Sequence, residues 1–314
     1  MSIPWSKSMQ KCWNLIERYR FKMRDLLRHF IVTTASLAAR RFPASLSRSI
    51  YRVPALANLI REGLNWALEP GFEEVTVAGG DLYGVRLRLN LREEKDYWLG
   101  TYEPDVMRTC RDLVVPGMIA YDIGAHIGYI SLFLAHRVGE GGQVFAFEAL
   151  LGNVTRLKEH IDLNAVSHRV HVIHAAVVRE NQPVRFFSGP SNATGRALGS
   201  AGRKSVFLGD EGLVAGVAID DFVFQQGHPA PQFIKMDIEG GEILALPGMI
   251  RTLQEKKPVL LLELHSEQAI QFTWEILTRV GYNLCTLKKG YPRVVSVEQL
   301  GQKAYLVAIA GGES

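Results

Sequence analysis

Two acidic residues and two glycines have the types and the spacing of a nucleoside-binding site. Asp122, Gly124 and Gly128 form the pattern D-x-G-x-x-x-G, and Glu148 follows 20 residues after the second glycine. Glycine permits a sharp turn and a close approach of backbone to ligand, and a helix start offers free N–H groups. A carboxylate at the tip of the next strand can accept protons from both ribose hydroxyls. The alternatives are a glycine-rich turn in another α/β protein and a solvated strand end at Glu148.

The spacing of the glycines indicates which cofactor is expected. A dinucleotide-binding loop has the pattern G-x-G-x-x-G, and a phosphate-binding loop has G-x-x-x-x-G-K-[ST], which is absent from the chain. The pattern at Asp122 resembles instead the first motif of S-adenosylmethionine-dependent methyltransferases. In those enzymes the loop wraps the methionine end of the cofactor.

A second group of acids lies later in the chain. Asp237, Glu239 and Glu242 fall within six residues, at the turn between a predicted strand over 232–236 and a helix. Carboxylates crowded in this way are costly unless something binds there. We expect Asp237 and Glu239 to face the substrate, and Glu242 to begin the helix, where an acid interacts favourably with the helix dipole. The alternative is a helix cap with spare charge.

Both groups are expected at the ends of strands. Apolar runs predict strands at 118–123, 143–147, 169–173, 232–236, 259–264, 282–287 and 305–310. Helical patterns alternate with the first strands, and such alternation is typical of a parallel sheet that binds ligands at its carboxyl edge. Ala175 and Ala176 follow the third strand and are small enough for an adenine ring to lie against the backbone. His265 follows the fifth.

The composition fits an ordinary globular protein with a basic extension. Hydrophobic residues make up 47% of the 314-residue chain, and its net charge is +4. Residues 1–70 hold 12 Lys and Arg against 4 Asp and Glu, so they carry +8 and the rest of the chain carries −4. We predict a basic helical extension at 1–70 and an α/β domain at 71–314.

The basic extension has the pattern of an amphipathic helix. Residues 5–34 repeat apolar side chains every three or four positions, and lysines and arginines fall largely on the other side. Such a helix can lie on an anionic membrane, or it can pack on the main domain or mediate self-association. Its least polar run, Phe30–Ala39, is shorter than the roughly 20 residues that a membrane-spanning helix needs.

The cysteines and the N-terminal residues bear on the compartment. Cys12, Cys110 and Cys285 are far apart, and no C-x-x-C pair is present, so neither a disulfide framework nor a zinc cluster is implied. Nearly thirty mixed-charge residues precede the least polar run, which is unlike a signal peptide. We expect a cytoplasmic protein, with peripheral membrane contact left open.

Taken together, these motifs resemble the FkbM family of S-adenosylmethionine-dependent methyltransferases. The similarity covers roughly residues 80–265, and the block D-x-E-G-x-E is its most distinctive part. It is carried by Trp98–Glu103, Asp122–Tyr129, Phe147–Glu148, Asn164, Ala175–Ala176, Ile234–Glu242 and Leu262–His265. His126 stands where the family typically has asparagine, and Ala149 stands where proline usually follows the acid.

The resemblance implies a Rossmann-like class I methyltransferase fold, an α/β fold with a mostly parallel seven-stranded sheet and helices on both faces. It implies S-adenosyl-L-methionine as the methyl donor, with Asp122 and Glu148 gripping opposite ends of the cofactor. The other cofactor-binding residues that it implies are Gly124, Ala125, His126, Gly128, Ala175 and Ala176.

The resemblance also implies the reaction, which is methylation of a hydroxyl group on a sugar, a glycan or another small natural product. The hydroxyl proton must be removed by a base or with the help of a bound metal. Our candidates for the base are Asp237 and His265, with Glu239 orienting the acceptor or holding a cation. His265 can equally be a buried structural histidine. The sequence assigns no metal ligand and leaves metal dependence open.

Three other classes of protein stay open. An NAD-dependent oxidoreductase would share the sheet and Glu148, but the glycine spacing disfavours it. A nucleic-acid methyltransferase would use the basic extension, yet no [DN]-P-P-[YFW] motif occurs and we expect no nucleic acid partner. A non-catalytic scaffold is the least favoured, because both cofactor acids and the D-x-E-G-x-E block are intact.

Overall fold

The computed structural model describes residues 71–189, 195–201 and 209–311, together with isolated positions before residue 71. The chain divides into two compact units, Met1–Tyr102 and Glu103–Ser314. The amphipathic helix expected at 5–34 lies largely outside the described residues and stays a prediction, as does the boundary after residue 70. In the described part of the chain, no helix combines the length and the apolar character needed to cross a bilayer.

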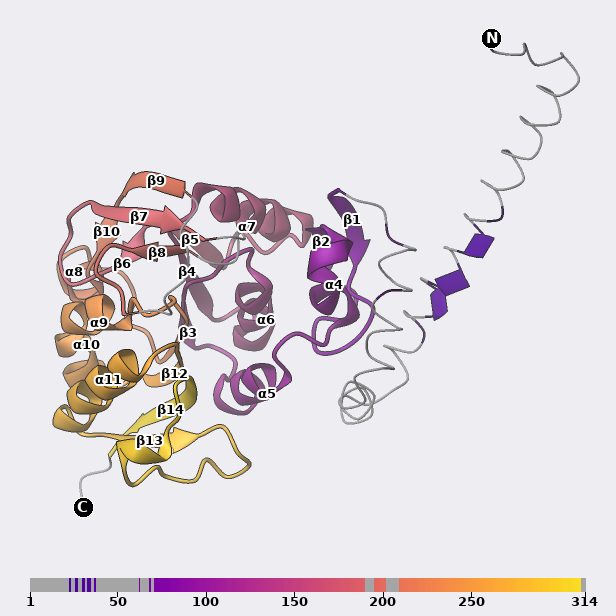
Figure 1. Ribbon diagram of the computed structural model, residues 1–314. Coiled ribbons are helices and arrows are strands. Elements are labelled where there is room, and N and C mark those ends of the chain that lie inside the picture. The colour runs from indigo at the N-terminus through magenta and orange to yellow at the C-terminus, as the bar shows by residue number, and fades with distance from the viewer. Residues whose placement is uncertain are drawn as a thin grey trace, which may run out of the picture. The chain divides into compact units, whose positions relative to one another are not determined.

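The first unit contains a β-hairpin followed by a helix (Figure 1). Strands β1 (Glu73–Thr76) and β2 (Arg86–Leu89) pair antiparallel. Helix α4 (Leu91–Leu99) begins at Asn90, whose side-chain oxygen accepts a hydrogen bond from a backbone N–H of the first turn. The sequence analysis does not predict this helix, because its charged residues lack a clear apolar stripe.

The second unit is built on a seven-stranded sheet in the order β13-β14-β12-β11-β3-β4-β5. Strand β14 runs in the opposite direction to the other six strands, so the expected mostly parallel sheet is confirmed. The strands are β3 (Ile119–Ile123), β4 (Gln143–Glu148), β5 (Val170–His174), β11 (Phe233–Met236), β12 (Val259–Leu264), β13 (Tyr282–Thr286) and β14 (Ala304–Ala310).

Helices cover both faces of this sheet, as expected (Figure 1). Successive strand residues point to opposite faces. Tyr121 and Ile123 of β3 pack in a core with residues of α8 (Ile219–Phe224), α9 (Glu242–Ala245), α10 (Ile250–Lys256) and α11 (Glu267–Arg279). Asp122 points the other way, toward Ser131, on the face covered by α5 (Pro104–Leu113), α6 (Tyr129–Val138) and α7 (Leu151–Leu163).

Shorter elements complete the second unit. Two small sheets accompany the main one: β6 pairs parallel with β10, and β7 pairs antiparallel with β8 and β9. These strands and the two 3-10 turns are β6 (Ala176–Val177), β7 (Val184–Ser188), β8 (Gly195–Ala197), β9 (Gly209–Val214), β10 (Gly216–Val217), η1 (Leu246–Gly248) and η2 (Val297–Gln299).

The order of the strands reverses between β3 and β11. From β3 the chain adds β4 and β5 on one side, and then crosses over to place β11 on the other. In an open α/β sheet, ligands bind beyond the carboxyl ends of the strands at such a reversal. The loop after β3 and the acids after β11 therefore meet at the edge where a ligand is expected.

Candidate active site

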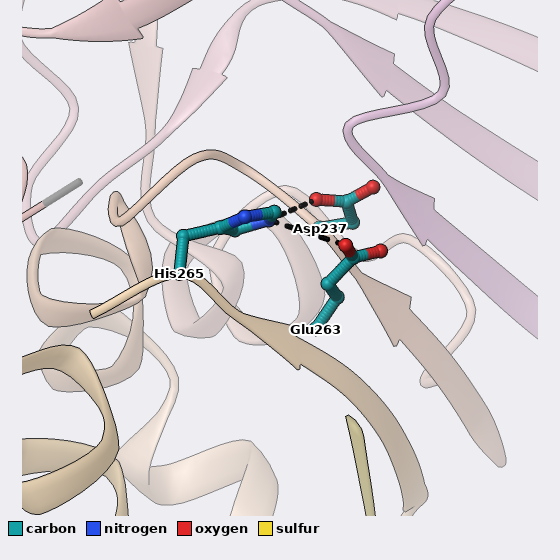
Figure 2. Close-up of side chains that lie close together, drawn as sticks. All are labelled: Asp237, Glu263 and His265. Carbon is teal, nitrogen blue, oxygen red and sulfur yellow. Dashed lines mark hydrogen bonds and ion pairs between the residues drawn. The ribbon is translucent and has the colours of Figure 1, made fainter. Parts of the chain in front are cut away.

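The pairing of β11 with β12 brings the predicted catalytic residues together. The parallel register aligns Met236 with Leu262. The next residue of each strand, Asp237 and Glu263, therefore lie side by side, and His265 is two positions further on the same side of the chain. Nε2 of His265 donates a hydrogen bond to Oδ1 of Asp237 at 2.8 Å and lies 3.7 Å from Oε1 of Glu263 (Figure 2).

Glu239 faces the other nitrogen of the same imidazole, with Nδ1 of His265 3.6 Å from its Oε2. Glu239 has a φ of +54° and Gly240 a φ of +89°, so the chain makes a left-handed turn directly after β11. Burial lowers the pKa of His265, but the hydrogen bond to Asp237 and the surrounding carboxylates outweigh burial and raise it. The arrangement therefore favours the imidazolium form of the ring.

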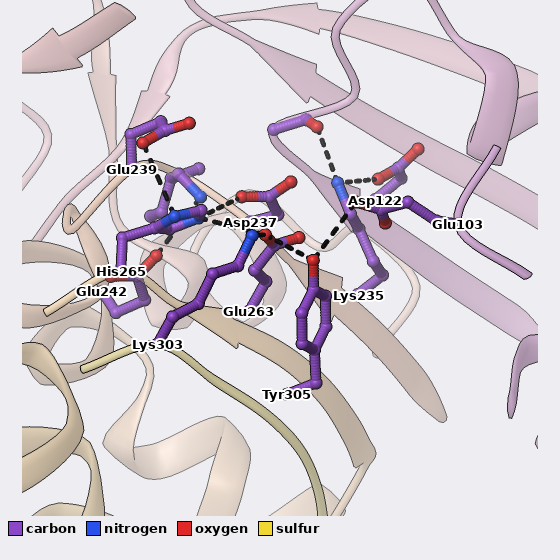
Figure 3. Close-up of polar contacts among 12 residues, drawn as sticks. Glu103, Asp122, Lys235, Asp237, Glu239, Glu242, Glu263, His265, Lys303 and Tyr305 are labelled. Carbon is purple, nitrogen blue, oxygen red and sulfur yellow. Dashed lines mark hydrogen bonds and ion pairs between the residues drawn. The ribbon is translucent and has the colours of Figure 1, made fainter. Parts of the chain in front are cut away.

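Strand β14 supplies residues that the sequence analysis did not select. Tyr305 is opposite Glu263 in the register of β14 and β12. Its hydroxyl donates to Oε1 of Glu263 at 2.8 Å and lies 3.5 Å from Oε1 of Glu103, while Lys303 forms an ion pair with Glu263 (Figure 3). Burial, together with the charges of Glu263 and Asp237, raises the pKa of Glu103 to about 7.

Glu242 begins helix α9, as the sequence predicts. Its side chain is fully buried, and Oε1 accepts a hydrogen bond from the N–H of Ile238 at 3.3 Å. Oε2 is buried with no hydrogen-bond partner among the described residues. Burial raises the pKa of Glu242 to about 7, so this acid tends to keep its proton near neutral pH.

On the other side of the strand reversal, Glu148 holds the glycine loop. Its Oε2 accepts from the backbone N–H of His126 at 2.8 Å, and its Oε1 accepts from the N–H of Leu150 at 2.8 Å and from Nδ2 of Asn153 at 3.4 Å. Burial raises the pKa of Glu148, and the two backbone N–H groups oppose that rise. The loop and the tip of β4 are thus joined through one carboxylate.

Gly124 joins the loop to the acids after β11. Its φ is +80°, and a Cβ atom at this position would lie 1.9 Å from the backbone oxygen of Asp237. A backbone oxygen cannot yield by rotating, so only glycine fits. The N–H groups of Gly124 and Ala125 both donate to the oxygen of Phe147 at 3.0 Å. The loop is therefore fixed against both neighbouring strands.

Asp122 lies behind this loop. Its side chain is fully buried, with Oδ2 2.6 Å from Oγ of Ser131 and Oδ1 3.3 Å from Nζ of Lys235. Burial raises the pKa of Asp122, while Lys235 and Ser131 oppose that rise. Lys235 also donates to the backbone oxygen of Gly124 at 2.8 Å (Figure 3). Asp122 contacts protein groups here, and its direct contact with a cofactor stays a prediction.

The remaining predicted cofactor residues serve the packing around the loop. A Cβ atom at Gly128 would lie 2.3 Å from Cδ1 of Leu157, so this glycine lets α6 and α7 approach closely. Ala175 is buried and donates its N–H to the oxygen of Glu148 at 3.0 Å. Ala176 belongs to β6 and is also buried. The structure thus places Ala175 beside the tip of β4.

The assembled site has a fixed backbone loop on one side and closely spaced acids on the other. The group of closely spaced acids includes five residues that the sequence does not indicate as site residues: Glu103, Glu263, Tyr305, Lys303 and Lys235. For Glu263 a signal exists, because it precedes His265 by two positions on a strand. Chemically, this set can accept a proton, bind a cation, or do both.

Comparison with known proteins identifies the family of the chain. A family model described as the methyltransferase FkbM domain matches residues 122–284. No curated protein sequence matches the chain. Among solved structures, methyltransferase FkbM from Methylobacillus flagellatus KT is 22% identical, with a TM-score of 0.41. That match covers 69% of this chain and 53% of the Methylobacillus protein, so this chain spans about half of its length.

Two further solved structures are similar to parts of the chain. Precorrin-6y C5,15-methyltransferase from Geobacter metallireducens GS-15 is 14% identical with a TM-score of 0.39, over 66% of this chain and 86% of that one. Fibrillarin from Aeropyrum pernix, in complex with natively bound S-adenosyl-L-methionine, is 8% identical with a TM-score of 0.39, over 65% of this chain and 73% of that one.

Proposed function

This chain belongs to the FkbM methyltransferase family, and from that premise we propose that it methylates a hydroxyl group of a sugar, a glycan or another small natural product. The family implies S-adenosyl-L-methionine as the methyl donor. The second unit has the Rossmann-like class I methyltransferase fold. An NAD-dependent oxidoreductase, considered from the sequence, does not fit this family.

The donor set at the glycine loop fits the cofactor. A carboxylate offers about four acceptor positions, and Glu148 uses part of them for the N–H groups of His126 and Leu150 and for Asn153. Acceptor capacity is therefore left for a ribose hydroxyl. We propose that Glu148, the Gly124–Gly128 loop and Ala175 hold the cofactor.

The observation that supports this function most directly is the contact between Gly124 and Asp237. A Cβ atom on Gly124 would lie 1.9 Å from the backbone oxygen of Asp237, so the glycine loop and the catalytic candidates are in direct contact. When bound, the cofactor supplies an electrophilic methyl group, whose bond to sulfur breaks with the electron pair on sulfur as the acceptor oxygen takes the carbon. Holding the acceptor oxygen in line with that carbon supplies much of the rate.

The hydroxyl proton must move to a protein group as the new bond forms. Both nitrogens of His265 face carboxylates, and the pKa of Asp237 is lowered by His265 and Lys235 against the effect of burial. Burial raises the pKa of Glu239, whose side chain is 31% exposed. We propose that Glu239 accepts the proton, and that Asp237 and His265 position the acceptor and Glu239.

Transfer of labelled methyl from S-adenosyl-L-methionine to sugars, glycans and small molecules of a cell extract tests the proposal. The expected product is a methyl ether, identified by mass spectrometry after acid treatment that cleaves methyl esters. Glu239→Gln should abolish the labelled product, while Glu140→Gln, a change in an exposed side chain on the same unit, should leave it unchanged. Label found only in nucleic acid or protein would contradict the proposed acceptor class.

A further inference from the structure

Three side chains at the ends of β11 and β12 have the composition and spacing of a metal site. Asp237, Glu263 and His265 each offer one ligand atom, and these atoms lie within 4.8 Å of one another (Figure 2). An imidazole nitrogen with two carboxylate oxygens suits a divalent ion such as Mn²⁺ or Zn²⁺. Ligand atoms held about 2.1 Å from such an ion lie up to about 4.2 Å apart, so at most the most distant pair must move closer, by roughly half an ångström.

The backbone already fixes two of these ligands. Glu263 lies within β12, one residue beyond its pairing with β11 and opposite Tyr305 of β14, and His265 directly follows that strand. The side chains of Glu263 and His265 are 7% and 5% exposed. Ligands carried by the rigid end of a buried strand need little ordering when an ion binds.

One oxygen of Glu263 has room for a further partner, although the other already contacts Lys303 and Tyr305. Its Oε2 is buried, and among the described residues it has no hydrogen-bond partner. A carboxylate oxygen removed from water without a partner is costly. The other oxygen, Oε1, is the one that lies 3.7 Å from Nε2 of His265 (Figure 2). A cation bound by this carboxylate next to the imidazole would give Oε2 a partner.

The opposite side of the imidazole faces a carboxylate at ion-pair distance, slightly longer than a hydrogen bond. A histidine that binds a metal through one nitrogen commonly donates its other N–H to a carboxylate, which fixes the ring. Nδ1 of His265 lies 3.6 Å from Oε2 of Glu239, while Nε2 faces Asp237 and Glu263. The ring is therefore oriented with Nε2 toward the two candidate ligands.

The charges around the cluster also favour a cation. Three carboxylates, those of Asp237, Glu239 and Glu263, surround the imidazole of His265 (Figure 3). Besides His265 itself, the basic side chain paired with them is Lys303. Lys235 is engaged with Asp122 and the backbone of Gly124. An ion with two positive charges would offset the excess.

We propose that Asp237, Glu263 and His265 bind a divalent metal ion. On binding, Nε2 of His265 releases its proton to solvent and replaces its hydrogen bond to Asp237 by a bond to the metal. Lys303 leaves Glu263, which its 34% exposed side chain permits. Resting on the proposed function, the ion polarises the acceptor hydroxyl, and its proton passes to Glu239 as the oxygen–carbon bond forms.

The test measures Mn²⁺ binding to the full chain by electron paramagnetic resonance. The protein is first dialysed against a chelator, and no cofactor is added. One saturable Mn²⁺ per chain is expected, displaced by excess Mg²⁺ or Zn²⁺. Glu263→Gln and Asp237→Asn should weaken binding at least tenfold. Lys303→Met should strengthen it severalfold, because it removes a competing charge from Glu263. Glu140→Gln is the control, since Glu140 also contacts a histidine, His168, but is exposed.

Absence of saturable Mn²⁺ binding, or binding that Glu263→Gln leaves unchanged, would overturn the proposal. Lys303→Met is informative even if the acid variants unfold, because its failure to tighten Mn²⁺ binding would also contradict the site. The outcomes separate the two proposals. If the protein binds Mn²⁺ but transfers no methyl group, the metal site is supported and the proposed function is overturned. If it transfers a methyl group but binds no Mn²⁺, the proposed function is supported and the metal site is overturned.

Discussion

The two sides of the strand reversal hold their carboxylates in opposite ways. On the β4 side, Glu148 accepts hydrogen bonds from backbone N–H groups, so its charge is balanced by fixed dipoles. On the β11–β12 side, Asp237, Glu239 and Glu263 surround one imidazole. A carboxylate with backbone partners is suited to holding a ligand in place. Carboxylates that crowd one another are suited to taking up a proton or a cation.

The largest expected effect tests the crowded side. Glu239→Gln removes the proposed proton acceptor, so kcat should fall by about 10²- to 10⁴-fold. Cofactor affinity should stay within about twofold, because the change lies outside the glycine loop. Methyl-transfer kinetics and calorimetry measure the two quantities. An unchanged kcat would contradict the assignment of proton transfer to the β11–β12 side of the site.

The next effect tests the boundary between the two sides. Gly124→Ala places a Cβ atom against the backbone oxygen of Asp237, and should lower the free energy of unfolding by about 2–4 kcal/mol. Gly117→Ala is a matched control, because Gly117 also has a positive φ, +88°, but no atom lies within 4 Å of its Cβ position. It should cost about 1 kcal/mol. If urea unfolding gave equal losses of unfolding free energy for the two variants, a steric clash between the new Cβ atom and Asp237 would be contradicted.

The third effect is a pH-dependent change in the free energy of unfolding caused by Glu242, no larger than the effect of Gly124→Ala. Its folded-state pKa of about 7 lies above the ordinary value of 4.5, so the folded protein binds a proton that the unfolded chain has released. Stability is therefore lost as the pH rises from about 4.5 to 7, by up to about 3 kcal/mol. Glu242→Gln should gain stability relative to the wild type as the pH rises, so the gain should be larger at pH 8 than at pH 5.

The control for this prediction has the opposite sign. Contacts with His168 and Arg169 lower the pKa of Glu140, so its contribution to stability is present above the ordinary pKa and is lost at lower pH. Glu140→Gln should therefore lose a little stability at pH 8, where Glu242→Gln gains. Unfolding of both variants in denaturant at pH 5 and pH 8 makes the comparison. Parallel behaviour of the two variants would contradict the buried, protonated state of Glu242.

The smallest effect tests the backbone-partnered side. Glu148→Gln keeps the size of the side chain but removes its charge and one acceptor oxygen. We expect affinity for S-adenosyl-L-methionine to fall about tenfold, or about 1.4 kcal/mol. The value of kcat at saturating cofactor should be nearly unchanged. A loss of kcat with intact affinity would reverse the roles assigned to the two sides.

The sequence predicts the parts of the site that local patterns encode. The glycine loop, Glu148 and the D-x-E-G-x-E block each follow an apolar strand, so their place at the carboxyl edge could be inferred. The meeting of Asp237 with His265 also follows from two parallel strands that end side by side. These features depend on one element and its nearest neighbour.

The rest depends on register between distant segments. Tyr305 meets Glu263 only because β14 inserts antiparallel beside β12, and no local pattern specifies that pairing. Glu103 joins them from the start of α5. The surroundings of Asp122 could not be inferred from the sequence either, because its contacts with Ser131 and Lys235 depend on which face of β3 it occupies. Sequence spacing identifies an acid at a strand end but not the face toward which it points.

The position of β14 also bears on the synthesis of the protein. This strand comes last among the strands of the sheet in the chain, yet it lies between β12 and β13. A nascent polypeptide therefore displays β12 with an unpaired edge until residues 304–310 have left the ribosome. Tyr305 and Lys303 arrive with that final insertion. The candidate active site is thus completed only when the segment that carries Lys303 and Tyr305 has been translated.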